Sequence, residues 1–185
     1  MEEGKKKEIV VGVTGSIAAF KAAELVSQLT RKNFRVTVVM TKAAQKFIRP
    51  LTFQALSKEP VITDLFSTKK NLDVNHISLA QRASLIIIAP ASANIIGKMA
   101  GGMADDFLST LIISASSPVL ICPAMNRHMY KNSLVRENIK KLKKDGFHFL
   151  GPGKGRLACG DEGLGRLIEV GKIVSEVFKI LKIPV

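Results

Sequence analysis

Short runs of apolar, mostly β-branched residues constrain the fold of this chain most. They are Glu8–Val13, Arg35–Met40 (RVTVVM), Leu85–Ala89 (LIIIA) and Val119–Cys122 (VLIC). Strands that are buried on both faces of a parallel sheet have continuous apolar sequences of this kind. Between the first two runs, Ile17–Thr30 carries apolar residues at helical spacing. This order predicts a β-turn-α-β unit that opens a parallel α/β sheet.

The remaining patterns extend the same architecture. A further strand is predicted at Phe147–Leu150. Helical spacing occurs at Ser92–Ala100, Asp106–Ser114, Ser133–Lys144 and Leu167–Leu181. Since there is no linker and no repeat, we expect residues 1–185 to form a single domain with its core at about 8–182. The predicted fold is a doubly wound, mainly parallel α/β sheet in a three-layer, Rossmann-like or flavodoxin-like sandwich.

Cysteine usage and hydropathy limit the class of protein. Cys122 and Cys159 are the only two cysteines, too few for a disulfide framework, and they form no CxxC zinc motif. No apolar run approaches the roughly 18 residues of a membrane span. The charged N-terminus has no apolar leader segment. These features predict a cytoplasmic protein without a membrane anchor.

The net charge of +13 predicts an anionic partner. Aromatic residues make up only 5% of the chain, and none of the usual nucleic-acid-binding motifs occurs. The charge therefore favours an anionic small molecule over nucleic acid. The lysine runs at 5–7 and 140–144 are typical of solvated faces.

Ligands of doubly wound sheets bind beyond the carboxyl ends of the strands. After the first strand, Gly15 and Ser16 stand at a helix start, where backbone N–H groups favour a phosphate; a tight turn with Ser16 as helix cap is the alternative. The second strand ends at Thr41 without the acidic residue of an NAD site. This pattern favours NADP or a mononucleotide such as FMN, whose phosphate would lie between Ser16 and Thr41.

Polar residues also follow the later strands. Ser92 and Asn94 suit the edge of a flat heterocycle, although a helix cap explains Ser92 as well. Asn126, close to two methionines, offers a bidentate hydrogen-bonding group in an apolar wall, or again a cap. His76 begins a predicted helix, where it is either a structural residue or a titratable group facing the same cleft. Cys122 is predicted to be a buried thiol at a strand end without a catalytic role.

The segment 151–166 holds six of the 14 glycines of the chain. Glycine loses more conformational freedom on folding than any other residue, so this density is costly in a scaffold. Lys154, Arg156 and Arg166 flank Cys159 within it. The segment is either a solvated loop or a lid that brings a thiol and positive charge onto an anionic ligand.

Five motifs taken together carry a family resemblance: GVTGSIAAFKA, VNHISLA, PASANIIGKMAGGMADD, PAMNRHMY and LACGDEGLGR. In this order, from Val10 to about Val177, the chain resembles the homo-oligomeric flavin-containing cysteine decarboxylases. Tyr130 stands where the family commonly has Trp. Many bacterial members also carry a C-terminal synthetase domain, so the resemblance implies that a separate synthetase protein supplies the substrate.

The resemblance implies an FMN-dependent carboxy-lyase that binds FMN at a subunit interface of a homotrimer, or of a dodecamer. The expected reaction converts the phosphorylated acyl-cysteine 4'-phosphopantothenoylcysteine to 4'-phosphopantetheine in coenzyme A biosynthesis. It proceeds by flavin oxidation of the thiol, loss of CO₂ and re-reduction of the enethiol. A flavin prenyltransferase, a peptidyl-cysteine decarboxylase and a non-catalytic flavin-binding regulatory subunit remain alternatives.

The family's site residues carry over by motif. The implied catalytic residues are His76, Asn126 and Cys159, and no metal is implied. Substrate contacts are implied for Asn126, Arg156, Leu157 and Ala158. Cofactor contacts are implied for Gly15, Ser16, Ile17, Thr41, Ser92, Ala93, Asn94, Ile95 and Ala124. Which of Lys154, Arg156 and Arg166 meets the substrate phosphate stays open.

Overall fold

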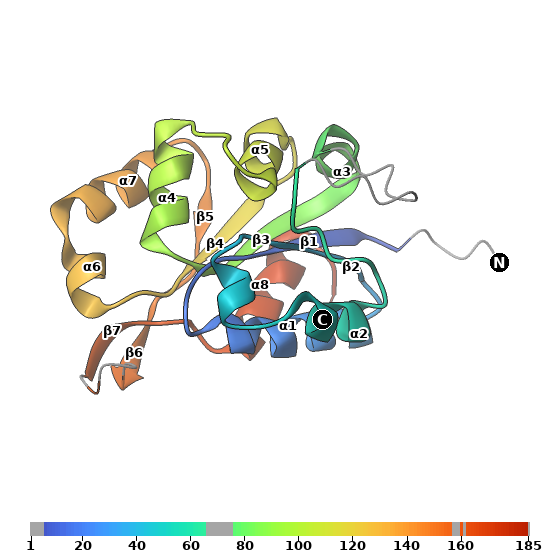
Figure 1. Cartoon of the computed structure of the whole chain (residues 1–185), viewed down its shortest axis with the longest axis horizontal. Helices are drawn as coiled ribbons and strands as arrows, with labels where there is room; N and C mark the ends of the chain where they lie inside the picture. The colour runs from blue at the N-terminus through green and yellow to red at the C-terminus, as the bar shows by residue number, and fades with distance from the viewer. Residues whose placement is uncertain (1–5, 66–75, 157–159, 161, 185) are drawn as a thin grey trace.

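A five-stranded parallel sheet forms the centre of the molecule, in the order β2-β1-β3-β4-β5 (Figure 1). The computed structural model describes residues 6–65, 76–156, 160 and 162–184. The strands are β1 (Glu8–Val13), β2 (Arg35–Met40), β3 (Ala83–Ala91), β4 (Val119–Pro123) and β5 (His148–Phe149). The predicted doubly wound parallel sheet is confirmed. Because β2 and β3 pair with opposite edges of β1, the strand order reverses there, and the ligand crevice of such a fold lies at the carboxyl ends of β1 and β3.

Helices cover both faces of the sheet (Figure 1). Residues of β1 alternate between two apolar cores: Ile9 and Val11 belong to one, Val10 to the other. One face is covered by α1 (Ala19–Arg31), α2 (Pro50–Ser57) and α8 (Val170–Ile180). The other is covered by α3 (His76–Arg82), α4 (Ala93–Gly101), α5 (Phe107–Ser114) and α7 (Ser133–Lys144). The result is the expected three-layer sandwich.

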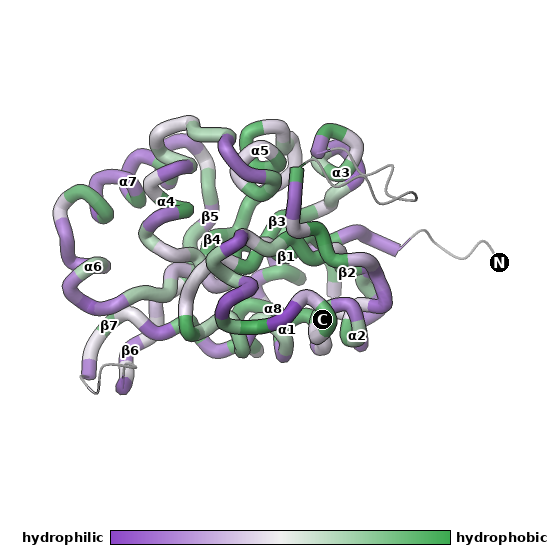
Figure 2. Tube along the Cα trace, viewed as in Figure 1, coloured by the Kyte–Doolittle hydropathy of each residue, from purple (hydrophilic) through white to green (hydrophobic). Residues whose placement is uncertain are grey.

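Burial explains why these segments form where the sequence predicts them. All residues of β1 and nearly all of β2 and β3 are buried, and they form the apolar centre of the tube in Figure 2. Side-chain caps fix two helix starts: Ser92 Oγ accepts from the Ile95 N–H, and Asp106 forms a reciprocal capping box with Ser109. Within the described residues, no helix is long and apolar enough to cross a membrane.

Most of the glycine-rich segment forms a hairpin beyond the sheet. Its strands, β6 (Gly153–Arg156) and β7 (Glu162–Arg166), pair antiparallel. The N–H of Met125, just after β4, donates to the Gly165 carbonyl oxygen at 3.0 Å and so fastens β7 beside the strand ends. The short helix α6 (Arg127–Lys131) lies next to β7 (Figure 1). A 3₁₀ turn at Ala44–Lys46 follows β2.

Candidate functional site

One buried hydroxyl joins the two strand ends at the crevice. Thr14 Oγ1 donates to the Pro90 carbonyl oxygen at 2.7 Å and accepts from the Ser92 N–H at 3.0 Å. Thr14 is only 1% exposed, so both bonds form away from water. They fix the turn after β1 against the turn after β3. The sequence analysis assigned no role to Thr14; a hydroxyl directly after a fully buried strand was the available signal.

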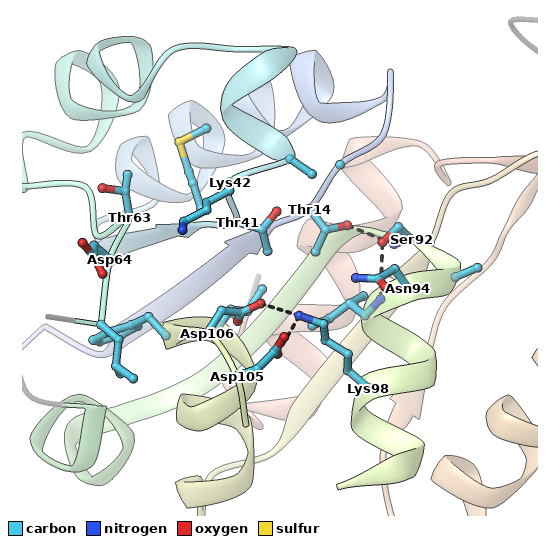
Figure 3. Close-up of a pocket in the computed structure, with 18 of the residues that line it drawn as sticks. Thr14, Thr41, Lys42, Thr63, Asp64, Ser92, Asn94, Lys98, Asp105 and Asp106 are labelled. Carbon is cyan, nitrogen blue, oxygen red and sulfur yellow. Dashed lines mark hydrogen bonds and ion pairs between the residues drawn. The ribbon is translucent and has the colours of Figure 1, made fainter. Parts of the chain in front are cut away.

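A cavity of about 640 Å³, here named the strand-end cavity, opens at this crevice (Figure 3). Its walls come from the turns after β1, β2 and β3, from residues 63–65, from α4, from the start of α5 and from α6. They include Thr14, Gly15, Thr41, Lys42, Ala43, Thr63, Asp64, Ser92, Ala93, Asn94, Ile95, Lys98, Asp105, Asp106 and Met129. This volume lies within the range of small-molecule and cofactor sites.

The start of α1 offers a cradle for one phosphate group. In the described part of the chain, the backbone N–H groups of Gly15, Ser16 and Ile17 donate to no protein acceptor. They precede a 13-residue helix whose dipole favours an anion at this end. The turn that holds Thr41 is adjacent, because the Thr41 N–H donates to the Val13 carbonyl oxygen at 3.1 Å and a Cβ built on Gly15 would lie 2.6 Å from Ala43 Cβ. The chemistry of these donors fits a mononucleotide phosphate.

A lysine and two carboxylates form a fixed charge cluster in the same cavity (Figure 3). Lys98 Nζ lies 2.6 Å from Asp105 Oδ1 and 2.9 Å from Asp106 Oδ2. Burial alone would lower the pKa of Lys98, but the hydrogen bonds to both carboxylates raise it. The hydrogen bond from Lys98 lowers the pKa of Asp105. Burial would raise the pKa of Asp106, but hydrogen bonds from Ser109 and Lys98 outweigh it and lower the pKa, so all three groups are charged at neutral pH. Sequence reasoning missed this cluster.

A second cavity, of about 710 Å³, adjoins the first and is here named the hairpin cavity. Gly15, Ser92, Ala93 and Met129 line both cavities. The other residues of its wall are Ser16, Ile17, Ala18, Phe20, Lys21, Ala124, Met125, Asn126, Arg156, Gly165, Arg166 and Leu167. Lys21, Arg156 and Arg166 give it positive charge. Lys154, although on the same hairpin, lines neither cavity.

Asn126 both caps a helix and faces the hairpin cavity. Its Oδ1 accepts from the His128 N–H at 2.8 Å, which fixes the side chain at the start of α6. The two interpretations of Asn126, cap and ligand group, are therefore compatible. Cys122 is fully buried, as predicted, and burial strongly raises the pKa of its thiol.

The structure brings together most of the site residues named from the sequence. Eleven of them line one or both cavities: Gly15, Ser16, Ile17, Thr41, Ser92, Ala93, Asn94, Ile95, Ala124, Asn126 and Arg156. His76 begins α3 and lines neither cavity. Leu157, Ala158 and Cys159 lie outside the described residues. Within those residues, no group of His, Cys, Asp or Glu could hold a metal ion.

Two curated relatives are similar in sequence to this chain over nearly its whole length. A Bacillus subtilis protein named coenzyme A biosynthesis bifunctional protein CoaBC is 48% identical over 169 residues, which cover 91% of this chain and 42% of that protein. The chain thus spans about two fifths of the length of the first such relatives. A Streptococcus mutans protein named probable phosphopantothenoylcysteine decarboxylase is 43% identical over 173 residues, covering 92% of this chain and 97% of that one.

Solved structures and a family model agree with these relatives. A PPC decarboxylase mutant complexed with pantothenoylaminoethenethiol has a TM-score of 0.85 and 31% identity, covering 96% of this chain and all of that chain. The model of the Flavoprotein family matches residues 1–182. With its phosphate cradle at the switch point of a doubly wound sheet, the chain therefore belongs to the flavoprotein family.

Proposed function

We propose that this protein is an FMN-dependent decarboxylase that converts 4'-phosphopantothenoylcysteine to 4'-phosphopantetheine in coenzyme A biosynthesis. The observation that carries the proposal is the pair of adjoining cavities in a flavoprotein chain. Gly15 of the phosphate cradle lines both cavities, whereas Ser16 and Ile17 line the hairpin cavity, which also has an amide and three cations. The decarboxylase name of the Streptococcus mutans relative, which this chain matches over 97% of its length, supports the reaction type.

The cofactor would be held at the crevice. Its phosphate would accept from the N–H groups of Gly15, Ser16 and Ile17 and from Thr41, while Ser92 to Ile95 and Ala124 would contact the rest of FMN. A bound flavin supplies reversible two-electron oxidation of the substrate thiol. Thr14 supports this arrangement from behind, because it holds the Ser92 backbone in place.

The chain's own residues would bind the substrate and manage its protons. Once the thiol is oxidised to a thioaldehyde, the electron pair of the breaking C–CO₂ bond can be delocalised onto sulfur. CO₂ then leaves and an enethiolate remains. Asn126 would hold the carboxylate or the neighbouring amide. The enethiolate is then reduced by one returned hydride and one proton, and Cys159, carried by the hairpin segment, would donate that proton. A well-placed acid of this kind contributes roughly 10²–10⁴-fold.

The cation-lined end of the hairpin cavity would receive the substrate phosphate. The sequence left open which of Lys154, Arg156 and Arg166 contacts the substrate phosphate. Arg156 and Arg166 line this cavity, together with Lys21. Lys154 does not line it and is assigned no contact. Because the mechanism needs a free thiol at Cys159, the protein would work in a reducing compartment, the cytoplasm. A synthetase would supply the acyl-cysteine, as the bifunctional name of the Bacillus subtilis relative suggests.

His76 fits the proposal if the site is shared between copies of the chain. It lines neither cavity of its own subunit. Ile17, Phe20 and Met129 line the cavities and are 58%, 61% and 48% exposed, which gives the rim an apolar surface suited to a partner. In the proposed homotrimer, or in a dodecamer, a second copy would cover this rim and place its His76 beside the substrate.

The decisive experiment supplies the purified, FMN-loaded protein with three substrates in parallel. With 4'-phosphopantothenoylcysteine we expect release of CO₂ and formation of 4'-phosphopantetheine. A peptide ending in cysteine tests peptidyl-cysteine decarboxylation, and dimethylallyl phosphate tests prenylation of the flavin. Turnover of either alternative substrate with none of the first would contradict the proposal. Flavin binding without turnover of any of them would favour a regulatory subunit.

A substitution separates the proposed proton donor from the rest of the site. Cys159→Ser should release CO₂ from 4'-phosphopantothenoylcysteine but accumulate the oxidised enethiol product, because the final proton donor is missing. Mass spectrometry of the product distinguishes it from 4'-phosphopantetheine by two hydrogen masses. If the variant forms 4'-phosphopantetheine at the wild-type rate, Cys159 is not the donor. The buried Cys122 offers the matched control: Cys122→Ala should leave the product unchanged.

A further inference from the structure

A third cavity, of about 620 Å³, shares no lining residue with the two cavities of the candidate site. It is here named the basic groove. It lies between α6, α7 and β7, at one end of the molecule (Figure 1). Its lining residues are Tyr130, Lys131, Arg136, Glu137, Ile139, Lys140, Lys143 and Leu164. Four of these are cationic and one is acidic.

The cations of the basic groove have no carboxylate partner in the described part of the chain. Lys131, Arg136 and Lys140 form no ion pair there, and Lys143 Nζ lies 5.6 Å from the centre of the Phe149 ring. The sequence predicted the lysine run at 140–144 to be a solvated face. Its side chains are exposed, but Lys140 and Lys143 converge on a cavity with two further cations.

Helix stability does not explain this arrangement. Arg136, Lys140 and Lys143 stand at i, i+4 and i+7 on α7, so they share one face of the helix. Like charges at such spacing destabilise a helix. Lysines in the last turn interact favourably with the helix dipole. Arg136, however, lies in the first half of α7, where a positive charge gains no stabilisation from the dipole. A bound anion would offset the repulsion.

The other lining groups narrow the class of anion. Tyr130, partly buried, offers an aromatic ring, and Ile139 and Leu164 add apolar surface. A bare polyanion would gain nothing from these groups and would be repelled by the Glu137 carboxylate. A nucleotide uses all of them: its base packs on ring and apolar side chains, its ribose hydroxyls donate to Glu137, and its phosphates meet the four cations.

We propose that the basic groove is a second anion site that binds a nucleoside polyphosphate. Its volume falls within the range of small-molecule sites, and the four cations match the charge of two or three linked phosphates. The site does not depend on the proposed decarboxylase activity, because it uses different residues. It also differs from the phosphate cradle at α1, which is built from backbone N–H groups.

Calorimetric titration of the FMN-saturated protein tests this site, since FMN blocks the cradle. ATP, tripolyphosphate and adenosine are the three probes. The groove variant replaces two cations, Arg136→Gln with Lys140→Gln. Its matched control, Lys144→Gln with Lys172→Gln, removes the same charge from exposed residues that line none of the three cavities described above. Circular dichroism and thermal unfolding check that both variants remain folded.

We expect ATP to bind the wild type at least about tenfold more tightly than either tripolyphosphate or adenosine. Tripolyphosphate lacks the contacts of the base and ribose, and adenosine lacks those of the phosphates. The groove variant should weaken ATP binding by about tenfold or more, and the control by less than about twofold. Absence of ATP binding, equal weakening in both double variants, or tripolyphosphate binding as tight as that of ATP would each overturn the proposal. An unfolded groove variant would be replaced by Lys131→Gln, on α6, judged by the same criteria.

Discussion

At the scale of single residues, Gly15 controls how closely the turn after β1 approaches the turn after β2. A Cβ on Gly15 would lie 2.6 Å from Ala43 Cβ, well inside contact distance. Gly15→Ala should therefore push the Thr41 segment away from the start of α1 and weaken FMN binding by about 1–3 kcal/mol, the usual cost of overpacking. Fluorescence titration of FMN with the apoprotein measures the loss.

The same contact supplies its own control. In the double variant Gly15→Ala with Ala43→Gly, the added methyl group has space, because the methyl group of Ala43 that it would meet is gone. FMN affinity should return most of the way to wild type. If the double variant binds no better than Gly15→Ala, the close approach of the two turns is not what the glycine provides.

Lys98 is the second residue whose role the structure makes testable. Hydrogen bonding from Lys98 lowers the pKa of Asp105. Burial alone would raise the pKa of Asp106, but hydrogen bonds from Ser109 and Lys98 outweigh burial, so that this pKa is lowered as well. Carboxylates with a lowered folded-state pKa stabilise the fold above the unfolded value of 3.8, and this contribution is lost as pH falls through the folded value. Lys98→Met removes the partner that both carboxylates share.

We expect Lys98→Met to lower the melting temperature at neutral pH, by an amount equivalent to about 1 kcal/mol or less because the cluster is partly exposed. The gap between variant and wild type should narrow below about pH 4, where the carboxylates become protonated. Thermal unfolding across the pH range gives this profile, with Lys42→Met, another cavity lysine that has no ion pair among the described residues, as control. A gap that stays constant down to about pH 2 would exclude the charge cluster as its cause.

At the scale of elements, the hairpin glycines make room for an arginine. A Cβ on Gly155 of β6 would lie 2.7 Å from Arg166 Nη1, so the guanidinium of β7 crosses the neighbouring strand where that strand has no side chain. Gly155 also has φ of +149°, which an L side chain rarely adopts. The sequence analysis explained these glycines by flexibility alone. The structure adds a steric reason for one of them.

Gly155→Ala should displace Arg166 and so raise KM for 4'-phosphopantothenoylcysteine by about tenfold, the cost of one lost contact to a charged group, with a smaller change in kcat. Steady-state kinetics separate the two constants, and bound FMN, measured by absorbance, should not change. Lys154→Ala is the control on the same strand, because Lys154 lines neither cavity. Equal effects of the two substitutions would mean that hairpin stability, rather than Arg166, sets KM.

The elements that the sequence predicted best are those buried on the sheet. The bounds of β1, β2 and α7 agree with the predicted ones, since burial on both faces or on one helical stripe leaves a clear pattern. The sequence predicts neither α2 nor α6, because α2 buries only two residues and α6 none. Nor does it predict the Lys98 cluster, which depends on the turn through Gly102, in a left-handed conformation, between α4 and α5. Local sequence patterns do not encode such contacts.

At the scale of the whole molecule, the described residues of one chain bring most of the residues named from the sequence to the two cavities, but not His76. Strand-end residues follow from the topology of a parallel sheet, so the sequence could place Ser16, Thr41 and Asn126 near one another. The position of His76 depends on how α3 packs and on what covers the cavities, and neither is written in a local pattern. His76 begins α3 and lines neither cavity. The shared site that we propose would bring His76 of one copy close to Asn126 of another.

A shared site predicts complementation between two variants that are each expected to be inactive in forming 4'-phosphopantetheine. His76→Asn lacks the proposed histidine and Cys159→Ser the proposed donor. If one copy provides His76 and its neighbour Cys159, random co-assembly leaves about one quarter of the sites with both wild-type residues. Co-expressed variants should therefore form 4'-phosphopantetheine at about one quarter of the wild-type rate per site. The same proteins, purified separately and mixed without refolding, are the control and should stay inactive. Co-assembled protein no more active than either parent would place both residues in sites formed by a single chain.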